Sequence, residues 1–483
     1  MLRTTKTLLL GATLFSGCMV GPQYHRPTAV VPNSYKEPPP SGWKEAQPNE
    51  GELRGKWWEI FQDPQLNVLE ERISISNQNI LAAEAQFRAA KDAVRIARSA
   101  LFPSVGIGAS VVNSRTSSTL TNNQFTSFSP GLRTLYNLPL DFNYQVDLWG
   151  SIRRTVTANA DIAQASAAEL ENARLLFQAE LAQDYFQLRG TDAAQDLLER
   201  TVRSFEEYLQ LTRSRLAVGV ASGADVAQAE TQLENARAQL IDLGVARTQL
   251  EHAIAVLTGK APAELSISHS ALQQVPPPVP VTIPSSLLER RPDIASAERQ
   301  MAAANEQIGI AKAAFYPQLT LSASAGMETS HFLQWFNWPS RMWSLGPQAS
   351  QFIFDGGRRR ASLQQAEALY DSSVAAYRQT VLAGFQQVED NLATLRVLEN
   401  EARATHDAVQ AAERALTIST AQYKAGTTAY LQVITAQTSA LQNERTAVDI
   451  LTRRTVATVL LVEALGGGWN ASTLPTAKDV RSP

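Results

Sequence analysis

The stretch "SALFPSVGIGASVV", Ser99 to Val112, decides the fold, because its pattern changes at a single proline. Up to Phe102 it continues an alanine-rich pattern that is typical of a helix, and after Pro103 it alternates as a half-buried strand does. Serines and glycines alternate with the apolar residues Val105, Ile107, Ala109 and Val111. The stretch therefore predicts a helix that continues into a strand with one apolar face and one small, polar face.

The same transition occurs a second time in the chain. "ILAAEAQFRAAKDAVRIARSALFPSVGIGAS" from Ile80 aligns with "IASAERQMAAANEQIGIAKAAFYPQLTLSAS" from Ile294, and "RLAVGVASGADV" from Arg215 aligns with "QYKAGTTAYLQV" from Gln422. The segment between the copies contains "QVPPPVPVTIP", a composition typical of a non-helical connector. The sequence therefore predicts two tandem structural repeats.

The sequence predicts the same order of helices and strands in each repeat. The expected pairs are helices 77–100 and 291–314, strands 104–112 and 318–326, strands 136–148 and 343–354, long helices 151–217 and 358–424, and helices 222–257 and 429–464. A helix over 151–217 is about 100 Å long at 1.5 Å per residue, so it needs partners along its whole length. The two shorter helices of each repeat, laid end to end, supply them, which predicts a mainly α fold with β-strands at one end.

These patterns divide the chain into six parts. They are a signal peptide 1–17, a lipidated extended segment 18–62, a first repeat 63–259, a proline-rich linker 260–290, a second repeat 291–468 and a C-terminal tail 469–483. Arg3 and Lys6 precede the apolar segment 8–15, as in an export signal. "SGC" then resembles a bacterial lipobox, which implies lipidation of Cys18 and anchoring in the outer membrane. An ordinary signal peptide with an incidental cysteine is the alternative.

All four predicted strands alternate and have the length of tilted transmembrane strands. The residues expected to face lipid are Val105, Ile107, Val111, Leu319 and Leu321. Because lipid tolerates no open sheet edge, four strands must share a barrel with other copies of the chain. Three chains would supply twelve strands, whereas the eight from two chains would leave no pore. A soluble sheet with one buried face is the alternative.

Arginines follow both strand pairs, where the long helices are expected to begin. Arg153, Arg154 and the run 358–360 lie in the first helical turn, where positive charge opposes the helix dipole. Our hypothesis is that they contact phosphates of the inner leaflet, and plain solvent exposure is the alternative.

Composition argues against several function classes. The single cysteine allows no intramolecular disulfide, and five scattered histidines show no metal-ligand spacing. A formal charge of −3 gives no case for nucleic-acid binding. No Ser/His/Asp arrangement, phosphate-binding loop or CxxC motif is present, so we expect neither an enzyme nor a cofactor.

Several stretches together resemble the TolC-type outer membrane efflux proteins, in the lipoprotein branch that serves resistance-nodulation-division (RND) pumps. They are "CMVGPQYHRP" at Cys18, "WWEIFQDPQLNVL" at Trp57, "VGVASGADV" at Val218, "LLERRPDIASAE" at Leu287 and "EALGGGW" at Glu463. The resemblance implies a homotrimer with a twelve-stranded barrel and a long periplasmic α-helical tunnel. It also implies that a periplasmic adaptor couples the tunnel to an inner-membrane RND transporter, so that small toxic compounds pass outward.

The resemblance places the adaptor-docking residues and the gate at the tips of the two helical hairpins. The docking residues carried over by position are Val218, Gly219, Val220, Ala221, Ser222, Asp225 and Gly426. The gate positions are Leu431, Gln432 and Thr435. Relatives often carry an acidic ring at the gate, which this chain lacks, so we expect Leu431 to form an apolar constriction with help from Asp225. Two other functions remain open, an outer membrane duct of a type I protein secretion system and a lipid-tethered coiled-coil scaffold.

Overall fold

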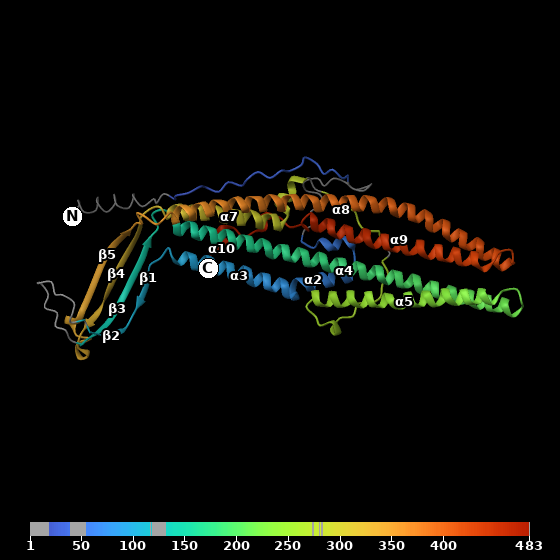
Figure 1. The fold of residues 1–483 in the computed structure, drawn as a ribbon, viewed down its shortest axis with the longest axis horizontal. Coiled ribbons are helices and arrows are strands. Elements are labelled where there is room, and N and C mark those ends of the chain that lie inside the picture. Colours follow the sequence, from blue (N-terminus) through green and yellow to red (C-terminus); the bar gives the residue numbers. More distant parts are fainter. Residues whose placement is uncertain are drawn as a thin grey trace.

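The structure is a computed structural model that describes residues 19–38, 55–115, 117, 132–272, 275–279, 281 and 284–482. It is an elongated molecule with a β-sheet at one end and two helix-hairpin tips at the other (Figure 1). The predicted lipidation site, Cys18, and the signal peptide lie outside the described residues.

The helices of the first repeat lie close to their predicted bounds. They are α3 (Gln78–Ser99), α4 (Ser151–Ala217) and α5 (Gly223–Leu257). The second repeat supplies α7 (Pro292–Ala313), α8 (Arg358–Ala425) and α9 (Tyr430–Ala464). Glycine ends both long helices as expected, because Gly219 and Gly426 have φ angles of 79° and 77°. Ser222 and Asp225 form the predicted capping box of α5.

Three short helices were not predicted as separate elements. They are α2 (Pro64–Ser76), α6 (Leu287–Arg290) and α10 (Ala477–Arg481). The side chain of Asp63 caps α2 by accepting hydrogen bonds from the backbone of Gln65 and Leu66, and Pro64 occupies the first turn. The sequence "DPQL" therefore carried a usable start signal for this helix.

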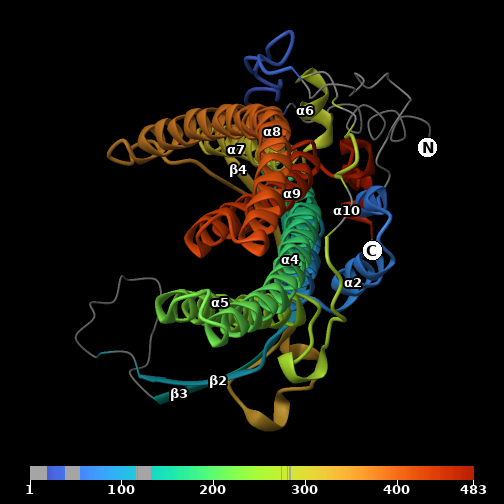
Figure 2. The same ribbon diagram turned by 90° about the vertical axis from the view of Figure 1, so that its right-hand side faces the viewer.

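The long helices form one curved layer (Figure 2). Near the sheet the neighbours in this layer run α3, α4, α7, α8, and near the tips they run α5, α4, α9, α8. Each long helix is thus lined by two shorter ones in succession, as predicted. Close approach is possible because α4 buries many small side chains, among them Ala158, Ala160, Ala163, Ala165, Ala167 and Ala168.

The sheet is antiparallel throughout. Its strands are β1 (Ser104–Ile107), β2 (Ser110–Arg115), β3 (Leu132–Val146), β4 (Gln318–Thr329) and β5 (Arg341–Ser350). β1 and β2 both pair with β3, followed by β4 and β5, so β1 and β2 lie at one edge and β5 at the other. Hairpin partners within each repeat therefore join into one sheet through the pairing of β3 with β4.

The predicted strand 104–112 is divided in two, and Pro139 of β3 explains the division. The register of β1 and that of β2 against β3 are continuous, which places Gly108 opposite Pro139. The Gly108 amide donates to the Pro139 carbonyl at 3.0 Å, but proline has no N–H to return the second bond. The ladder is interrupted while the alternation of faces is preserved.

Other strand bounds also differ from prediction. β3 covers Leu132–Val146 instead of 136–148, and β5 covers Arg341–Ser350 instead of 343–354. β3 stops early because the Asp147 carboxylate accepts hydrogen bonds from the backbone of Ile152 and Arg153, which makes residues 147–150 the turn that precedes α4. Asp355 does the same for α8 by accepting from the backbone of Arg359.

Candidate functional site

The first hairpin tip presents the predicted docking residues on one exposed turn. Val218 is 74% exposed and Val220 is 64% exposed, on either side of Gly219. The Asp225 carboxylate accepts hydrogen bonds from the Ser222 amide at 2.8 Å and from its hydroxyl at 2.9 Å. These bonds commit Oδ2 of the Asp225 carboxylate to the cap of α5.

The second hairpin tip carries the candidate gate residues. Gly426 closes α8, and Tyr430 is buried at the start of α9. Leu431 is 56% exposed, and Gln432 and Thr435 are exposed next to it. The three gate positions therefore share an exposed face, while Val433 and Ile434 between them pack inward.

The two tips are joined by Arg215, which sequence reasoning missed. Its guanidinium donates a hydrogen bond to the carbonyl of Tyr423 at 2.7 Å and lies over the Tyr423 ring at 4.5 Å. Positive charge at these last carbonyls of α8 is favourable, because they form the negative end of the helix dipole. Next to this contact, Tyr208 and Thr420 share a hydrogen bond of 2.8 Å. Nothing local in the sequence indicates a contact across 208 residues.

An apolar cluster next to the tips contains side chains from the four helices α4, α5, α8 and α9. Its buried members are Phe205, Leu209, Ala229, Leu233, Ala236, Tyr423, Tyr430, Val433 and Ile434. The tips are therefore a packed four-helix end whose outermost turns stay exposed.

The residues expected to face lipid share one face of the sheet. Val105 lies opposite Phe142, Phe142 opposite Ala323, and Ala323 opposite Leu345, so one apolar row crosses β1, β3, β4 and β5. Val105, Ile107 and Val111 are 64%, 74% and 55% exposed. Leu319 and Leu321 lie on the same face but are half-buried, because β4 has neighbours on both sides. On the opposite face, Ser324 lies between Asp141 and Ser344.

Aromatic side chains gather at both ends of this sheet. At the end next to the helices, Trp149 stacks on Tyr316 with ring centroids 4.6 Å apart. At the far end, Tyr136 contacts Phe332 at 5.6 Å and Trp335 at 5.3 Å.

The structure corrects the arginine hypothesis for Arg154. This side chain is 2% exposed and forms an ion pair with Glu306 at 2.7 Å, so it does not contact lipid phosphates. Arg153 pairs with Asp147 at 3.0 Å and Arg359 with Asp355 at 2.6 Å. Of the five arginines, Arg358 and Arg360 are exposed, Arg153 and Arg359 are half-buried, and Arg154 is buried.

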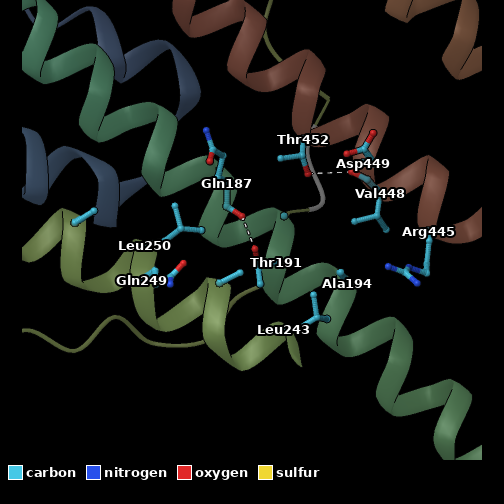
Figure 3. Close-up of a pocket in the computed structure, with 13 residues that line it drawn as sticks. Gln187, Thr191, Ala194, Leu243, Gln249, Leu250, Arg445, Val448, Asp449 and Thr452 are labelled. Atoms are coloured by element: carbon cyan, nitrogen blue, oxygen red, sulfur yellow. Dashed lines mark hydrogen bonds between the residues drawn. The ribbon is translucent and has the colours of Figure 1, made fainter. Parts of the chain in front are cut away.

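A cavity of about 650 Å³ lies between α4, α5 and α9 (Figure 3). Its polar lining consists of Gln187, Thr191, Gln249, Arg445, Asp449 and Thr452. Asp449 lies 3.5 Å from Arg453, and Arg445 donates to Gln239 at 2.8 Å. The charged groups are thus already paired, and the lining offers no acid–base dyad. Within the described ranges, no group of His, Cys, Asp and Glu is arranged to hold a metal ion, and no helix is long and apolar enough to cross a membrane.

Burial raises the pKa of Glu70 in α2 well above its ordinary value, and three further carboxyl groups have pKa values raised to about 6 or 7. Burial raises the pKa of Glu463 to about 7, against the opposing effect of Arg291. Burial also raises the pKa of Asp161 and of Asp184 to about 6 each. All three lie on helices, away from the sheet and the tips, so they bear on stability rather than on the candidate gate.

Comparison with known proteins shows which family the chain belongs to. The family model described as outer membrane efflux protein matches residues 70–260 and 283–467. The chain is 29% identical over 475 residues to the probable efflux pump outer membrane protein TtgC of Pseudomonas putida, covering 98% of this chain and 97% of that one. It is 32% identical over 469 residues to outer membrane protein OprJ of Pseudomonas aeruginosa, covering 96% and 95%.

The fold agrees as well. A solved structure of the outer-membrane channel OprN superposes with a TM-score of 0.85 and 29% identity, over 94% of this chain and 100% of that one. On the strength of the family match and these relatives, this chain belongs to the outer membrane efflux protein family.

Proposed function

We propose that the chain is a lipid-anchored subunit of a homotrimeric outer membrane channel. The trimer passively conducts small toxic compounds that an inner-membrane RND pump delivers through a periplasmic adaptor. The proposal includes acylation of Cys18 and no catalytic activity. The observation that carries it is the sheet, whose two faces differ in polarity and whose two edges are both open.

The dimensions of the sheet fit a bilayer. β4 has 12 residues, and at about 3.3 Å per residue such a strand is about 40 Å long. A tilt of about 40° reduces its vertical span to about 30 Å, which is the thickness of the hydrocarbon core. The aromatic groups around Trp149 and around Trp335 lie at the two ends of this span, where aromatic belts of transmembrane barrels lie.

The open edges support assembly with copies of the same chain. The sheet ends in β1 and β2 on one side and in β5 on the other, while the helical layer ends in α3 and α5 on one side and in α8 on the other. Pairing one edge with the opposite edge of the next copy is a head-to-tail contact, and such contacts close into rings. Three copies would give a twelve-stranded barrel above a tunnel of helices, which removes every open edge from lipid.

The tips are proposed as the adaptor-docking surface. Val218 and Val220 are apolar and exposed at the end furthest from the sheet, as a surface for a protein partner would be. Leu431 faces out of its own chain beside this surface, and in a ring of three copies it would narrow the opening. A closed state would then depend on apolar contact instead of on an acidic ring.

A paired substitution tests the membrane channel. Ile107→Lys places a charge on the apolar face, whereas Gly106→Lys places one on the opposite face, where an added Cβ meets nothing within 4 Å. A lysine in the bilayer midplane costs about 2–4 kcal/mol on the lipid face. We therefore expect Ile107→Lys to abolish the detergent-resistant trimer and Gly106→Lys to retain it and its conductance in planar bilayers.

The same preparation can contradict the proposal. A parent protein that is monomeric after extraction, or one that inserts without conducting, would leave a tether as the better description. Equal tolerance of both lysines would show that neither face meets lipid.

A further inference from the structure

The described residues at the N-terminal end, 19–38, form an extended segment that we call the strap. It starts beside the first turn of α4 and runs along the outside of α7 and α8 (Figure 1). Tyr24 donates to Glu298 of α7 at 2.6 Å, and Arg26 donates to Tyr377 of α8 at 3.1 and 3.0 Å. Further along, the amides of Lys36 and Glu37 donate to the carboxylate of Glu389 at 2.7 and 2.9 Å. The strap thus connects α4, α7 and α8.

Its first residues are held by the buried Arg154. The guanidinium donates to the carbonyl of Val20 at 2.8 Å and to that of Pro22 at 3.1 Å. Glu306 of α7 accepts from the third donor, Nη1, at 2.7 Å. The Val20 amide in turn donates to the carbonyl of Trp149 at 3.1 Å. Without the strap, two donors of a buried cation would lose these acceptors, which makes the ion pair and the strap one unit.

Three glycines make room for this contact. A Cβ on Gly309 would overlap the Arg154 side chain, and a Cβ on Gly150 would overlap Met19. Gly21 has a φ of 115°, and a Cβ there would lie 2.6 Å from the Cα of Gly309. The glycine of "GPQY" is therefore required both by its backbone conformation and by the lack of space.

We propose that Arg154, oriented by Glu306, is the positioning residue that fixes the start of the strap against the first turn of α4. Resting on the proposed lipidation of Cys18, this contact has a consequence for the anchor. Met19 packs against Gly150, so the acylated residue would be attached next to the point where strand becomes helix. Arg154 would then couple the depth of the lipid anchor to that of the sheet.

The test places a nitroxide label on a cysteine substituted for Gln23, an exposed strap residue, in the full-length protein extracted from membranes. Arg154→Gln removes the guanidinium. Arg154→Lys keeps the charge opposite Glu306, but its single ammonium lacks the geometry to donate to the carbonyls of both Val20 and Pro22. Gly21→Ala disturbs the strap and removes neither partner of the ion pair between Arg154 and Glu306. A preparation without the Gln23 substitution reports any label on Cys18.

The controls are matched to the variants. Arg153→Gln removes the neighbouring arginine, which pairs with Asp147. Gly55→Ala introduces a Cβ at a glycine with a φ of 73° that has nothing within 4 Å. The EPR spectrum of the nitroxide contains a slow component when the motion of the label is restricted. We expect this slow component in the parent and in both controls. We expect it to be lost in Arg154→Gln, Arg154→Lys and Gly21→Ala.

A slow component that survives in both Arg154 variants would overturn the proposal. If it were then lost in Gly21→Ala alone, the anchoring would be assigned to the glycines. If Arg154→Gln does not fold, Arg154→Lys decides. Trimer formation and conductance of the parent are recorded separately, so a non-conducting parent would refute the proposed channel without affecting the result for the strap.

Discussion

Gly190 of α4 lies directly against Thr452 of α9, and an added Cβ at Gly190 would overlap the threonine side chain. The contact lies beside the cavity shown in Figure 3, where the two repeats meet. Threonine at this position also bonds to its own helix, because its hydroxyl donates to the Val448 carbonyl at 2.9 Å. The absence of a side chain at residue 190 therefore sets how closely α4 and α9 approach.

Gly190→Ala is expected to destabilise the protein by about 1–3 kcal/mol, the usual cost of overpacking. The control is Gly244→Ala in α5, where an added Cβ meets nothing within 4 Å. Because alanine favours a helix over glycine by about 1 kcal/mol, the control should be neutral or stabilising. Denaturant unfolding of both variants measures this difference. Equal unfolding midpoints for Gly190→Ala and Gly244→Ala would show that α9 moves at Thr452 with little cost in free energy.

Arg215→Gln is expected to loosen the connection between the two hairpin tips. It removes a charged donor to the Tyr423 carbonyl, a bond worth about 1.5–3 kcal/mol. Hydrogen exchange in peptides covering 420–434 should accelerate. Arg213→Gln is the matched control, since Arg213 pairs with Glu230 within the first hairpin. Similar exchange in the two variants would mean that the apolar cluster alone holds the tips together.

Leu431→Ser is expected to raise the conductance of the closed trimer in a planar bilayer. The change replaces an exposed apolar side chain at the proposed constriction with a small polar one. Gln432→Asn, one residue further along α9, changes size slightly and keeps the polarity, so its closed level should match the parent. An unchanged closed level in Leu431→Ser would place the constriction elsewhere.

Glu463 predicts a pH dependence of stability. Its pKa is raised by burial to about 7 in the folded chain, whereas an unfolded glutamate titrates near about 4.3. Between these values the folded state binds more protons, so the free energy of unfolding falls as the pH rises from about 4 to about 7. In the parent, this fall in the free energy of unfolding should amount to about 2 kcal/mol, allowing for partial solvent access, and Glu463→Gln should abolish it.

Thermal unfolding at pH 5 and pH 8 checks this expectation. The parent should lose stability between the two conditions more than Glu463→Gln does. Glu234→Gln, at an exposed position in α5, should follow the parent. An identical shift in the parent and in Glu463→Gln would assign the pH dependence to other buried carboxyls such as Asp161 and Asp184.

Local signals predicted the order and type of the main elements. Pro103 and Pro317 mark the change from helix to strand, and the alternation from Val105 to Val111 identified the apolar face that the register confirms. The capping pair Ser222 and Asp225 placed the start of α5 within one residue. Such signals are readable because they act between residues a few positions apart.

Prediction failed mainly where a distant residue decides the outcome. Pro139 divides the first strand from across the sheet. The end of β3 is a local effect that the alternation did not reveal, because Asp147 directly after it caps the following helix. Arg153 and Arg154 are neighbours of the same type, yet one is paired at the surface and the other is buried beneath the strap.

The sequence by itself determined that this chain is a twofold repeat of helices and alternating strands, because periodicity and capping are properties of adjacent residues. Only the tertiary structure decided which charges are buried, how the two repeats lock at Gly190, and that Arg215 joins the tips. Those features depend on the space and the partners that remain after residues hundreds of positions apart have packed together, and such constraints have no local pattern.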